Sequence, residues 1–577
     1  MKRGFLAVAV SLALAGCGSS SSWQSPGRDI KTLPTSSWGA FRDAYIEGWF
    51  KLNPGFAVYQ GRHDFDGKLP DWSAAGLKKQ SDFLRDTIAE AQTFDPKKLS
   101  ADDRFERDYL ISVAKGQLFW LDDADQPHHN PAYYVNAGLD PNVYIARPYA
   151  EKPARMRAMI TFFQEIPAAA AQIKANLKTP MPLSFVNYGV AAFKGFADFY
   201  TGDARAAFAD VRDPALQRDF NTASDAAAKA MRDLATWIEA QRGSATQDFA
   251  LGADRFKRML LATEGVDMEL DALEEIGRHD MADNREALAE ACHKFLPGAK
   301  VRDCIAKMSA NKPDGGPVAE ARRQIPTLRK FVESHDLVSI PGTEQALVEE
   351  SPPYNRQNSA YIDPPGPFDK GIPSVYYISP PDPSWPKAVQ DGFVPGKADL
   401  LFTSVHEVMP GHFVQFLHAN RSPSIFGRIF VGYAFAEGWA HYAEQMMWDA
   451  GLNEGDPETH IGQLANALLR DCRFLSAIGL HTWGMTQEQS KQLFMDKCFQ
   501  DEGTAIQQAA RGTYDPAYLN YTMGKLMIRR LRDDWVKTRG ERKAWKAFHD
   551  KFLSYGGPPI PLVRQAMMGE DSAKAKF

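Results

Sequence analysis

HEVMPGH, residues 406–412, is the stretch of this chain that departs most informatively from a known pattern. The common zinc-binding helix carries HExxH, in which two histidines four residues apart share one helical face and the glutamate acts as general base. Here the second histidine comes six residues after the first. At about 100° per residue, His412 would lie roughly 120° around a regular helix from His406, too far for one ion.

The two residues before His412 can correct this geometry. Pro410 has no N–H to donate to the carbonyl of His406, so a regular helix is interrupted there. Gly411 tolerates backbone angles that other residues resist. A bulge or short unwinding at this pair can therefore bring His412 back towards His406. The alternative is a helix that ends at Met409 and is followed by an unrelated histidine.

A second helical segment offers a carboxylate for the same ion. Residues 434–448, AFAEGWAHYAEQMMW, are dominated by Ala, Met and aromatic residues. Glu437, His441 and Glu444 recur at intervals of four and three residues, so they share one helical face. A carboxylate in such apolar surroundings is unfavourable unless it is paired or binds a metal. Two imidazoles and one carboxylate leave the fourth tetrahedral position of a catalytic zinc site open.

We therefore predict a Zn(2+) cofactor, and the predicted ligands are His406, His412 and Glu437. Glu407, beside the first ligand, is predicted to be the general base that takes a proton from water. Glu444 is expected to orient a ligand histidine or to pair with a cation. His441 either donates a hydrogen bond to a ligand or is a packed core histidine.

The N-terminus predicts the cellular compartment. Residues 1–16 combine a basic start with a short apolar run, the layout of a secretory signal peptide rather than a membrane span. The LAGC motif that ends at Cys17 resembles a bacterial lipobox, which implies lipidation of Cys17. Residues 17–37 then form a flexible tether. We expect a lipid-anchored protein of the cell envelope that faces the periplasm at the outer membrane; a plain signal peptide is the alternative.

The composition excludes some functions and leaves the disulfides open. The net charge of −5 gives no support to nucleic-acid binding, and no later apolar run approaches the length of a membrane span. Four further cysteines in an oxidising compartment permit two disulfides; they are Cys292, Cys304, Cys472 and Cys498. The first two flank a Leu-Pro-Gly turn, where a bridge would staple a helical hairpin. The second two are either bridged or buried thiols.

The rest of the chain is predicted to be mainly α. Residues 38–346 form a helical N-terminal part, in which Pro167 is expected to kink or divide a helix at 154–177. Residues 347–577 form the catalytic part, in one continuous unit with the first. The fold class is a large helical body, similar to zinc metallopeptidases, with a small β-sheet just before the HEVMPGH helix. Its strands are expected at 359–363 and 374–378, within a Pro-rich loop.

Several stretches together resemble a bacterial family known as domain of unknown function 885. They include HEVMPGHFVQ, AEGWAHYAE, RDCRFLSAIGLHTWGMTQEQ and YTMGKLMIRRLR, in the order found in that family. The family is grouped with gluzincin-like zinc metallopeptidases, and the resemblance implies His406, His412 and Glu437 as ligands and Glu407 as the catalytic glutamate. Many members have a second histidine after PGH, where this chain has Phe413.

Other catalytic and substrate-binding residues are hypotheses from position and type. A carbonyl under attack develops negative charge on oxygen and needs a donor besides the metal. The candidates are Tyr521, His481, Arg511 and Tyr377. Tyr521 comes first, because a phenol donates without a buried charge, whereas Arg511 can instead hold a substrate carboxylate. The strand at 359–363, with Ala360 and Tyr361, can present its edge to an extended peptide.

The sequence thus predicts a lipid-anchored zinc metallopeptidase whose substrates are peptides, by analogy short ones. Two alternatives remain: an envelope scaffold lipoprotein that binds zinc without turnover, and a zinc amidase acting on a substrate that is not a peptide. The sequence does not distinguish endopeptidase from exopeptidase action, and it leaves the oligomeric state unknown.

Overall fold

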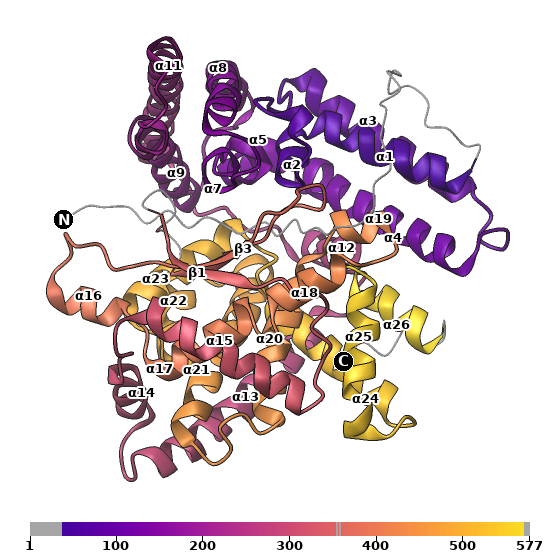
Figure 1. The fold of residues 1–577 in the computed structure, drawn as a ribbon, viewed down its shortest axis with the longest axis vertical. Coiled ribbons are helices and arrows are strands. Elements are labelled where there is room, and N and C mark those ends of the chain that lie inside the picture. The colour runs from indigo at the N-terminus through magenta and orange to yellow at the C-terminus, as the bar shows by residue number, and fades with distance from the viewer. Residues whose placement is uncertain (1–36, 353–355, 357–358, 570–576) are drawn as a thin grey trace. The chain divides into compact units, whose positions relative to one another are not determined.

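The computed structural model describes residues 37–352, 356, 359–569 and 577. The predicted signal peptide at 1–16, the lipidation site Cys17 and the tether up to residue 36 lie outside the described residues. The described chain is mainly α-helical with one small three-stranded sheet, which confirms the predicted fold class (Figure 1). Among the described helices, none is both long and apolar enough to cross a bilayer.

The chain forms two compact units. The first contains the chain up to Phe249, Pro365–Ile372 and Ser424–Phe430. The second contains Ala250–Pro364, Pro373–Pro423 and Val431–Phe577. Residues 250–346, which the sequence analysis placed in the N-terminal part, pack in the same compact unit as the HEVMPGH region.

The first unit is helical. Its helices are α1 (Trp38–Leu52), α2 (Pro54–Tyr59), α3 (Ala74–Thr93), α4 (Ala101–Leu118), α5 (Gln126–His129), α6 (Pro131–Tyr134), α7 (Val143–Ala146), α8 (Lys152–Asn176), α9 (Leu183–Thr201), α10 (Asp203–Phe208), α11 (Pro214–Glu239) and α19 (Ile425–Ile429). Helix α8 continues through Pro167 and is not divided there. Phe163 of α8 packs its ring against Tyr200 of α9 and Phe220 of α11, which ties these three helices together (Figure 1).

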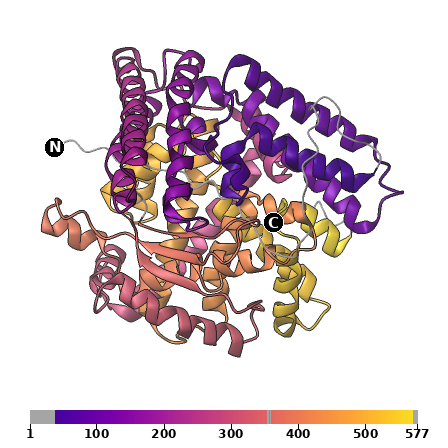
Figure 2. The same cartoon turned by 45° about the horizontal axis from the view of Figure 1, so that its top comes forward.

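The second unit contains all of the predicted metal site. Its elements are α12 (Ala253–Glu264), α13 (Leu270–Phe295), α14 (Val301–Ala310), α15 (Pro317–Ser334), β1 (Ala346–Glu350), β2 (Ala360–Asp363), β3 (Ser374–Ile378), α16 (Lys387–Phe393), α17 (Lys397–Glu407), α18 (His412–Ala419), α20 (Tyr433–Asp449), α21 (Pro457–Thr482), α22 (Gln487–Lys497), α23 (Glu502–Tyr514), α24 (Asn520–Val536), α25 (Trp545–Ser554) and α26 (Ile560–Met568). The three strands lie among the helices of this unit (Figure 2).

The sheet has the strand order β1-β3-β2. Strand β1 runs parallel to β3, and β2 runs antiparallel to β3 with Tyr361 opposite Tyr377. Both expected strands are present, and β1 was not expected. The order places β2 at an edge of the described sheet.

Two glycine contacts bring helices of this unit unusually close. A Cβ on Gly438 of α20 would lie 2.5 Å from the Cα of Gly524 on α24, and one on Gly524 would lie 2.1 Å from the carbonyl oxygen of Ala434. Likewise, a Cβ on Gly277 of α13 would meet the ring of Phe474 on α21 at 2.3 Å. Side chains at these positions would separate the backbones, so the glycines set the spacing of the helices.

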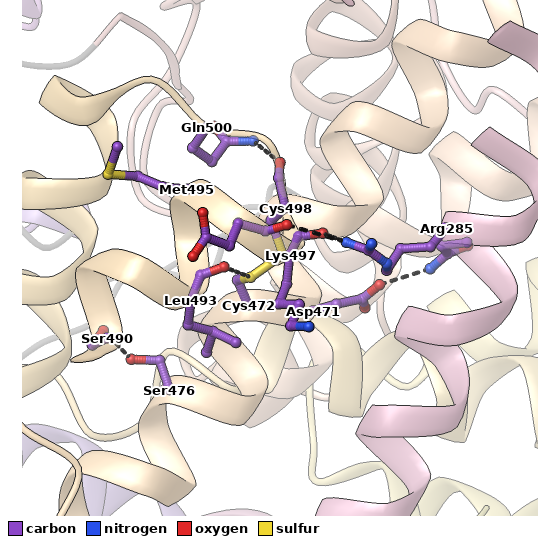
Figure 3. Close-up of a disulfide and its surroundings, with 12 residues drawn as sticks. Arg285, Asp471, Cys472, Ser476, Ser490, Leu493, Met495, Lys497, Cys498 and Gln500 are labelled. Carbon is purple, nitrogen blue, oxygen red and sulfur yellow. Dashed lines mark hydrogen bonds between the residues drawn. A yellow bond between two sulfur atoms is a disulfide. The ribbon is translucent and has the colours of Figure 1, made fainter. Parts of the chain in front are cut away.

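Both possible disulfides are present. Cys292 is bonded to Cys304, which joins α13 to α14. Cys472 of α21 is bonded to Cys498, just after α22 (Figure 3). Both pairs close loops within the second unit, as expected for a protein of an oxidising compartment.

Candidate metal centre

The helix that carries HEVMPGH is interrupted where the Pro-Gly pair predicts. Helix α17 ends at Glu407 and α18 begins at His412. Between them the N–H of Gly411 donates to the carbonyl oxygen of Val405 at 2.9 Å. A Cβ on Gly411 would lie 1.8 Å from the carbonyl oxygen of His406, so only glycine fits. Its φ of −69° is ordinary, so the reason for glycine is this close approach rather than an unusual backbone angle.

The interruption brings the two histidines together. Their ring centroids lie 4.9 Å apart, with the ring planes at 90°. Nε2 of His406 lies 3.3 Å from Oε2 of Glu437, and Nε2 of His412 lies 3.4 Å from the same oxygen. All three side chains are buried. Helix α20 thus presents Glu437 to both histidines, the grouping that the sequence predicts.

These three donors fit a zinc ion. Zinc bonds of about 2.0–2.1 Å in a tetrahedral arrangement separate neighbouring ligand atoms by about 3.3–3.4 Å. The separations of the two imidazole nitrogens from Oε2 of Glu437 match that spacing. Oε2 of Glu437 is buried and makes no hydrogen bond with any described residue. A buried carboxylate oxygen that faces two imidazoles without a hydrogen bond is well suited to binding a cation.

Glu444 fixes the orientation of His406. Its Oε1 lies 2.7 Å from Nδ1 of His406, on the opposite side of the ring from the nitrogen that faces Glu437. With the proton on Nδ1, Nε2 keeps its lone pair for a metal. Arg470 of α21 pairs with the same Oε1 at 3.1 Å, and Nδ1 of His441 lies 3.3 Å from Oε2. Glu444 therefore has the expected orienting position, and His441 contacts Glu444 rather than a ligand.

The charges of the group follow from these contacts. Burial alone would raise the pKa of Glu437, but His412 and His406 outweigh burial and hold that pKa well below its usual value. Burial lowers the pKa of His406, yet its contacts with the carboxylates of Glu437 and Glu444 raise it to about 9. Burial lowers the pKa of His441 to about 4, so this histidine is neutral.

Glu407 is held by the neighbouring strand. Its Oε2 accepts a hydrogen bond of 3.1 Å from the backbone N–H of Ile362 in β2. On the opposite edge of this segment, which faces β3, the carbonyl oxygen of Ser359 accepts a hydrogen bond from the N–H of Ser379. Because backbone groups alternate along a strand, Ala360 and Ile362 direct their N–H and C=O groups away from β3. The edge of β2 that faces Glu407 is therefore the edge without a strand neighbour in the described sheet.

Tyr521 lies beside the predicted ligand His406, and Cζ of Arg511 lies 5.9 Å from the Tyr521 ring centroid. The ring of Tyr521 stacks against His406 at 6.4 Å and meets Tyr433 edge-on at 5.8 Å. Burial raises the pKa of Tyr521, so the phenol keeps its proton. Arg511 is paired with Asp515 at 2.9 Å and donates to the hydroxyl of Tyr433 at 2.7 Å. Tyr521 thus contacts a predicted ligand, whereas the charge of Arg511 is paired with Asp515.

His481 has a different position from the one considered for it. Its Nδ1 accepts from the N–H of Leu251 at 3.2 Å, and its Nε2 lies 2.7 Å from the carbonyl oxygen of Gly512. Burial lowers the pKa of His481 to about 4. It lies eleven residues after Arg470 on α21, which is about 16 Å along the helix axis. The structure therefore gives His481 a packing role and no place at the metal centre.

The other predicted substrate residues lie on the sheet. Tyr361 and Tyr377 form a cross-strand pair with ring centroids 5.1 Å apart, and both are half-buried. Ala360 lies one residue before Tyr361 on β2. That Tyr361, Tyr377 and Ala360 contact a substrate stays a prediction.

Two arginines of the site were missed. Arg470 and Arg473 lie one turn apart on α21, both buried. In the sequence their signal is RDCRF, a spacing of three residues. Charged residues at that spacing usually mark a solvated helix face, so this signal alone did not distinguish them.

Comparisons with known proteins give a family and a fold. The family described as "Bacterial protein of unknown function (DUF885)" matches residues 54–567. A solved "putative lipoprotein of unknown function from Shewanella oneidensis" is 26% identical with a TM-score of 0.77, over 92% of this chain and 100% of that one. A solved "putative lipoprotein from Colwellia psychrerythraea" is 16% identical with a TM-score of 0.75, over 91% and 97% of the two chains, and shares the fold. The comparison with curated proteins gives no match.

Proposed function

The chain belongs to the bacterial DUF885 family of unknown function, and for this member we propose zinc-dependent hydrolysis of peptide bonds. The observation that carries the proposal is the convergence of His406 and His412 on Oε2 of Glu437, with Glu407 next to the first histidine in the chain. Two histidines, one glutamate and an adjacent base are the residue set of a zinc hydrolase.

The residues of the chain have separate tasks in this reaction. When bound, zinc supplies Lewis acidity, which makes a water molecule a better proton donor and polarises a carbonyl. Glu407 accepts the proton of the attacking water and passes it to the departing amine. Its Oε2 is engaged by Ile362, which leaves Oε1 for that proton. Glu444 keeps the proton of His406 on Nδ1.

Tyr521 is the donor that we propose for the developing oxyanion. It lies against His406, and its raised pKa keeps the hydroxyl protonated at neutral pH. A neutral phenol can stabilise negative charge on the substrate oxygen without itself requiring a buried counter-ion.

We propose that the edge of β2 binds the substrate backbone. Ala360 and Ile362 direct backbone groups towards that edge, next to Glu407. An extended peptide that pairs with this edge would lie along the strand with its carbonyls near the base. In this proposal the small sheet of a mainly helical protein holds the backbone of the substrate.

The cell envelope is the proposed place of action. The chain begins with residues that resemble a signal peptide and a lipobox ending at Cys17. A similar protein from Shewanella oneidensis is described as a putative lipoprotein. Both observations support a lipid-anchored peptidase that faces the periplasm.

A digest of a synthetic peptide library tests the function. Zinc-loaded protein is incubated with the library with and without a chelator, and the products are identified by mass spectrometry. We expect cleavage that the chelator abolishes and zinc restores. A protein that binds zinc stoichiometrically but cleaves no library member would favour the scaffold alternative, and cleavage of non-peptide amides alone would favour the amidase.

A further inference from the structure

Three buried arginines lie near Tyr521 or His406, and only two of them have a carboxylate partner among the described residues. Arg470 is paired with Glu444, and Arg511 with Asp515. Arg473 is 9% exposed and forms no ion pair with a described carboxylate. Burial lowers the pKa of Arg473; Tyr521 partly offsets this, and Arg511 and Arg470 lower the pKa further.

A hydrogen bond and a ring contact fix the guanidinium of Arg473, while the edge formed by its two Nη nitrogens makes no hydrogen bond with a described residue. Its Nε donates to Oε1 of Gln508 at 2.8 Å, a bond between two buried side chains. Its Cζ lies 4.7 Å from the ring centroid of Tyr521. Neither Nη nitrogen donates a hydrogen bond to a described residue. A buried cation without a counter-ion is unfavourable, so its retention in a fixed orientation indicates an anion that binds there.

Arg473 is close to the metal ligands. The ring of Tyr521 contacts both residues: its centroid lies 4.7 Å from Cζ of Arg473 and 6.4 Å from the ring centroid of His406. Arg473 also lies one helical turn from Arg470, whose Nη2 is 3.4 Å from Nδ1 of His406. The three residues from Arg470 to Arg473 advance about 4.5 Å along the helix, a little more than one residue of extended peptide.

We propose that Arg473 binds the free C-terminal carboxylate of a peptide substrate, so that the enzyme removes one or two residues from the carboxyl end. The planar guanidinium matches a carboxylate through two parallel N–H···O bonds. Because Tyr521 contacts both Arg473 and His406, a carboxylate on Arg473 would place the end of the peptide near the proposed metal centre. This inference rests on the proposed peptidase function and defines its substrate class.

The test compares an N-acetylated tripeptide that ends in a free carboxylate with its C-terminal amide. Hydrolysis by the zinc-loaded full chain is followed by mass spectrometry for both peptides. We expect kcat/KM for the acid to exceed that for the amide by about tenfold to a hundredfold, as for a charge-assisted hydrogen-bond pair. The products should be a C-terminal amino acid or dipeptide. Equal rates for the two peptides, or cleavage far from the carboxyl end, would overturn the proposal.

Arg473→Gln should reduce the acid-to-amide ratio to within about threefold, mainly through a higher KM for the acid. Arg473→Lys keeps the charge without the planar fork and should retain part of the preference. Arg278→Gln, at an exposed arginine paired with Glu274, is the matched control and should leave the ratio unchanged. A preference that persists in Arg473→Gln would assign the carboxylate to another residue.

Binding separates this inference from the proposed reaction. Titration calorimetry with zinc-loaded Glu407→Gln protein measures the affinity for the acid and the amide without turnover. Tighter binding of the acid, lost in the double variant with Arg473→Gln, supports the carboxylate site even if the wild type cleaves nothing, an outcome that would refute only the peptidase. Equal affinities for the acid and the amide would refute the carboxylate site.

Discussion

Glu444 places its Oε1 2.7 Å from Nδ1 of His406, while Nε2 of the same ring faces Glu437 at 3.3 Å. One carboxylate thus lies on each side of a single imidazole. Because Glu444 accepts from Nδ1, it favours the tautomer whose Nε2 keeps the lone pair that faces Glu437, as the proposed zinc site requires.

Glu444→Gln should weaken zinc binding by about tenfold to a hundredfold, because the amide stabilises the Nδ1 proton less than a carboxylate does. Competition with a chromogenic chelator measures the affinity. Glu344→Gln, at an exposed glutamate paired with Arg421, is the control. An affinity equal to that of the wild type would show that Glu444 serves only to neutralise Arg470.

Glu407→Gln should retain stoichiometric zinc and lose hydrolysis by at least about a hundredfold, because the amide oxygen can still accept from the N–H of Ile362 but cannot take a proton. Zinc content by atomic spectroscopy and kcat with a library-derived peptide are the readouts. Glu349→Gln, half-exposed on β1, is the matched control. Full activity in Glu407→Gln would exclude it as the base.

Gly524→Ala should destabilise the second unit by about 1–3 kcal/mol. The new Cβ would lie 2.1 Å from the carbonyl oxygen of Ala434, and relieving that clash requires a shift of the backbone. The displaced α24 also carries Tyr521, so kcat should fall as well. Gly392→Ala, where a Cβ meets nothing within 4 Å, should leave the melting temperature unchanged or slightly higher. Unchanged stability in Gly524→Ala would mean that α20 and α24 separate easily.

Replacing Cys472 and Cys498 by serine should lower stability by about 3–4 kcal/mol, since this bridge closes 26 residues of chain. Cys472 lies between Arg470 and Arg473 on α21 (Figure 3 shows the bridge), so the acid-to-amide ratio should fall too. The control is the other bridge, Cys292–Cys304, whose loss should lower stability by about 3 kcal/mol without changing the ratio. Equal selectivity in both double variants would show that α21 does not depend on its bridge.

Glu264 should make stability depend on pH. Burial raises its pKa to about 8, its Oε1 accepts from Asn520 at 2.9 Å, and its buried Oε2 has no hydrogen bond among the described residues. The folded protein therefore holds a proton that the unfolded chain releases near pH 4.5. Stability from this group is full below about pH 4.5 and is lost as pH rises to about 8, at about 1.4 kcal/mol per pKa unit.

Glu264→Gln cannot ionise, so its melting temperature should fall less than that of the wild type between pH 5 and pH 8, approximate limits set by the two pKa values. Gln324→Glu, at a buried amide of α15, adds an ionisable group and should steepen the decline. Parallel melting curves for Glu264→Gln and the wild type would contradict the raised pKa.

Local patterns made much of the site predictable. The Pro-Gly pair predicts the interruption between α17 and α18, and the spacing of Glu437 and Glu444 predicts one face of α20. Contacts between distant segments were not predictable in the same way. The role proposed for Arg473 depends on its contacts with Gln508 and Tyr521, which lie on other helices.

The strand that was not expected and the division into two units have similar physical causes. Strand β1, ALVEE, buries only Val348, so it lacks the alternation that identifies a half-buried strand. Helices α12–α15 have the same character as the helices before them, and only packing such as that of Gly277 on Phe474 assigns them to the second unit.

The hydrogen bond from Ile362 to Glu407 has a consequence for solubility. A strand at the edge of a sheet exposes unpaired backbone groups that recruit strands of other molecules. The Glu407 carboxylate occupies one of the outward N–H groups of β2, so a foreign strand cannot complete a ladder there without displacing it. A foreign strand, like the peptide proposed as substrate, can therefore pair with the outward groups of Ala360 but must compete with Glu407 for the N–H of Ile362.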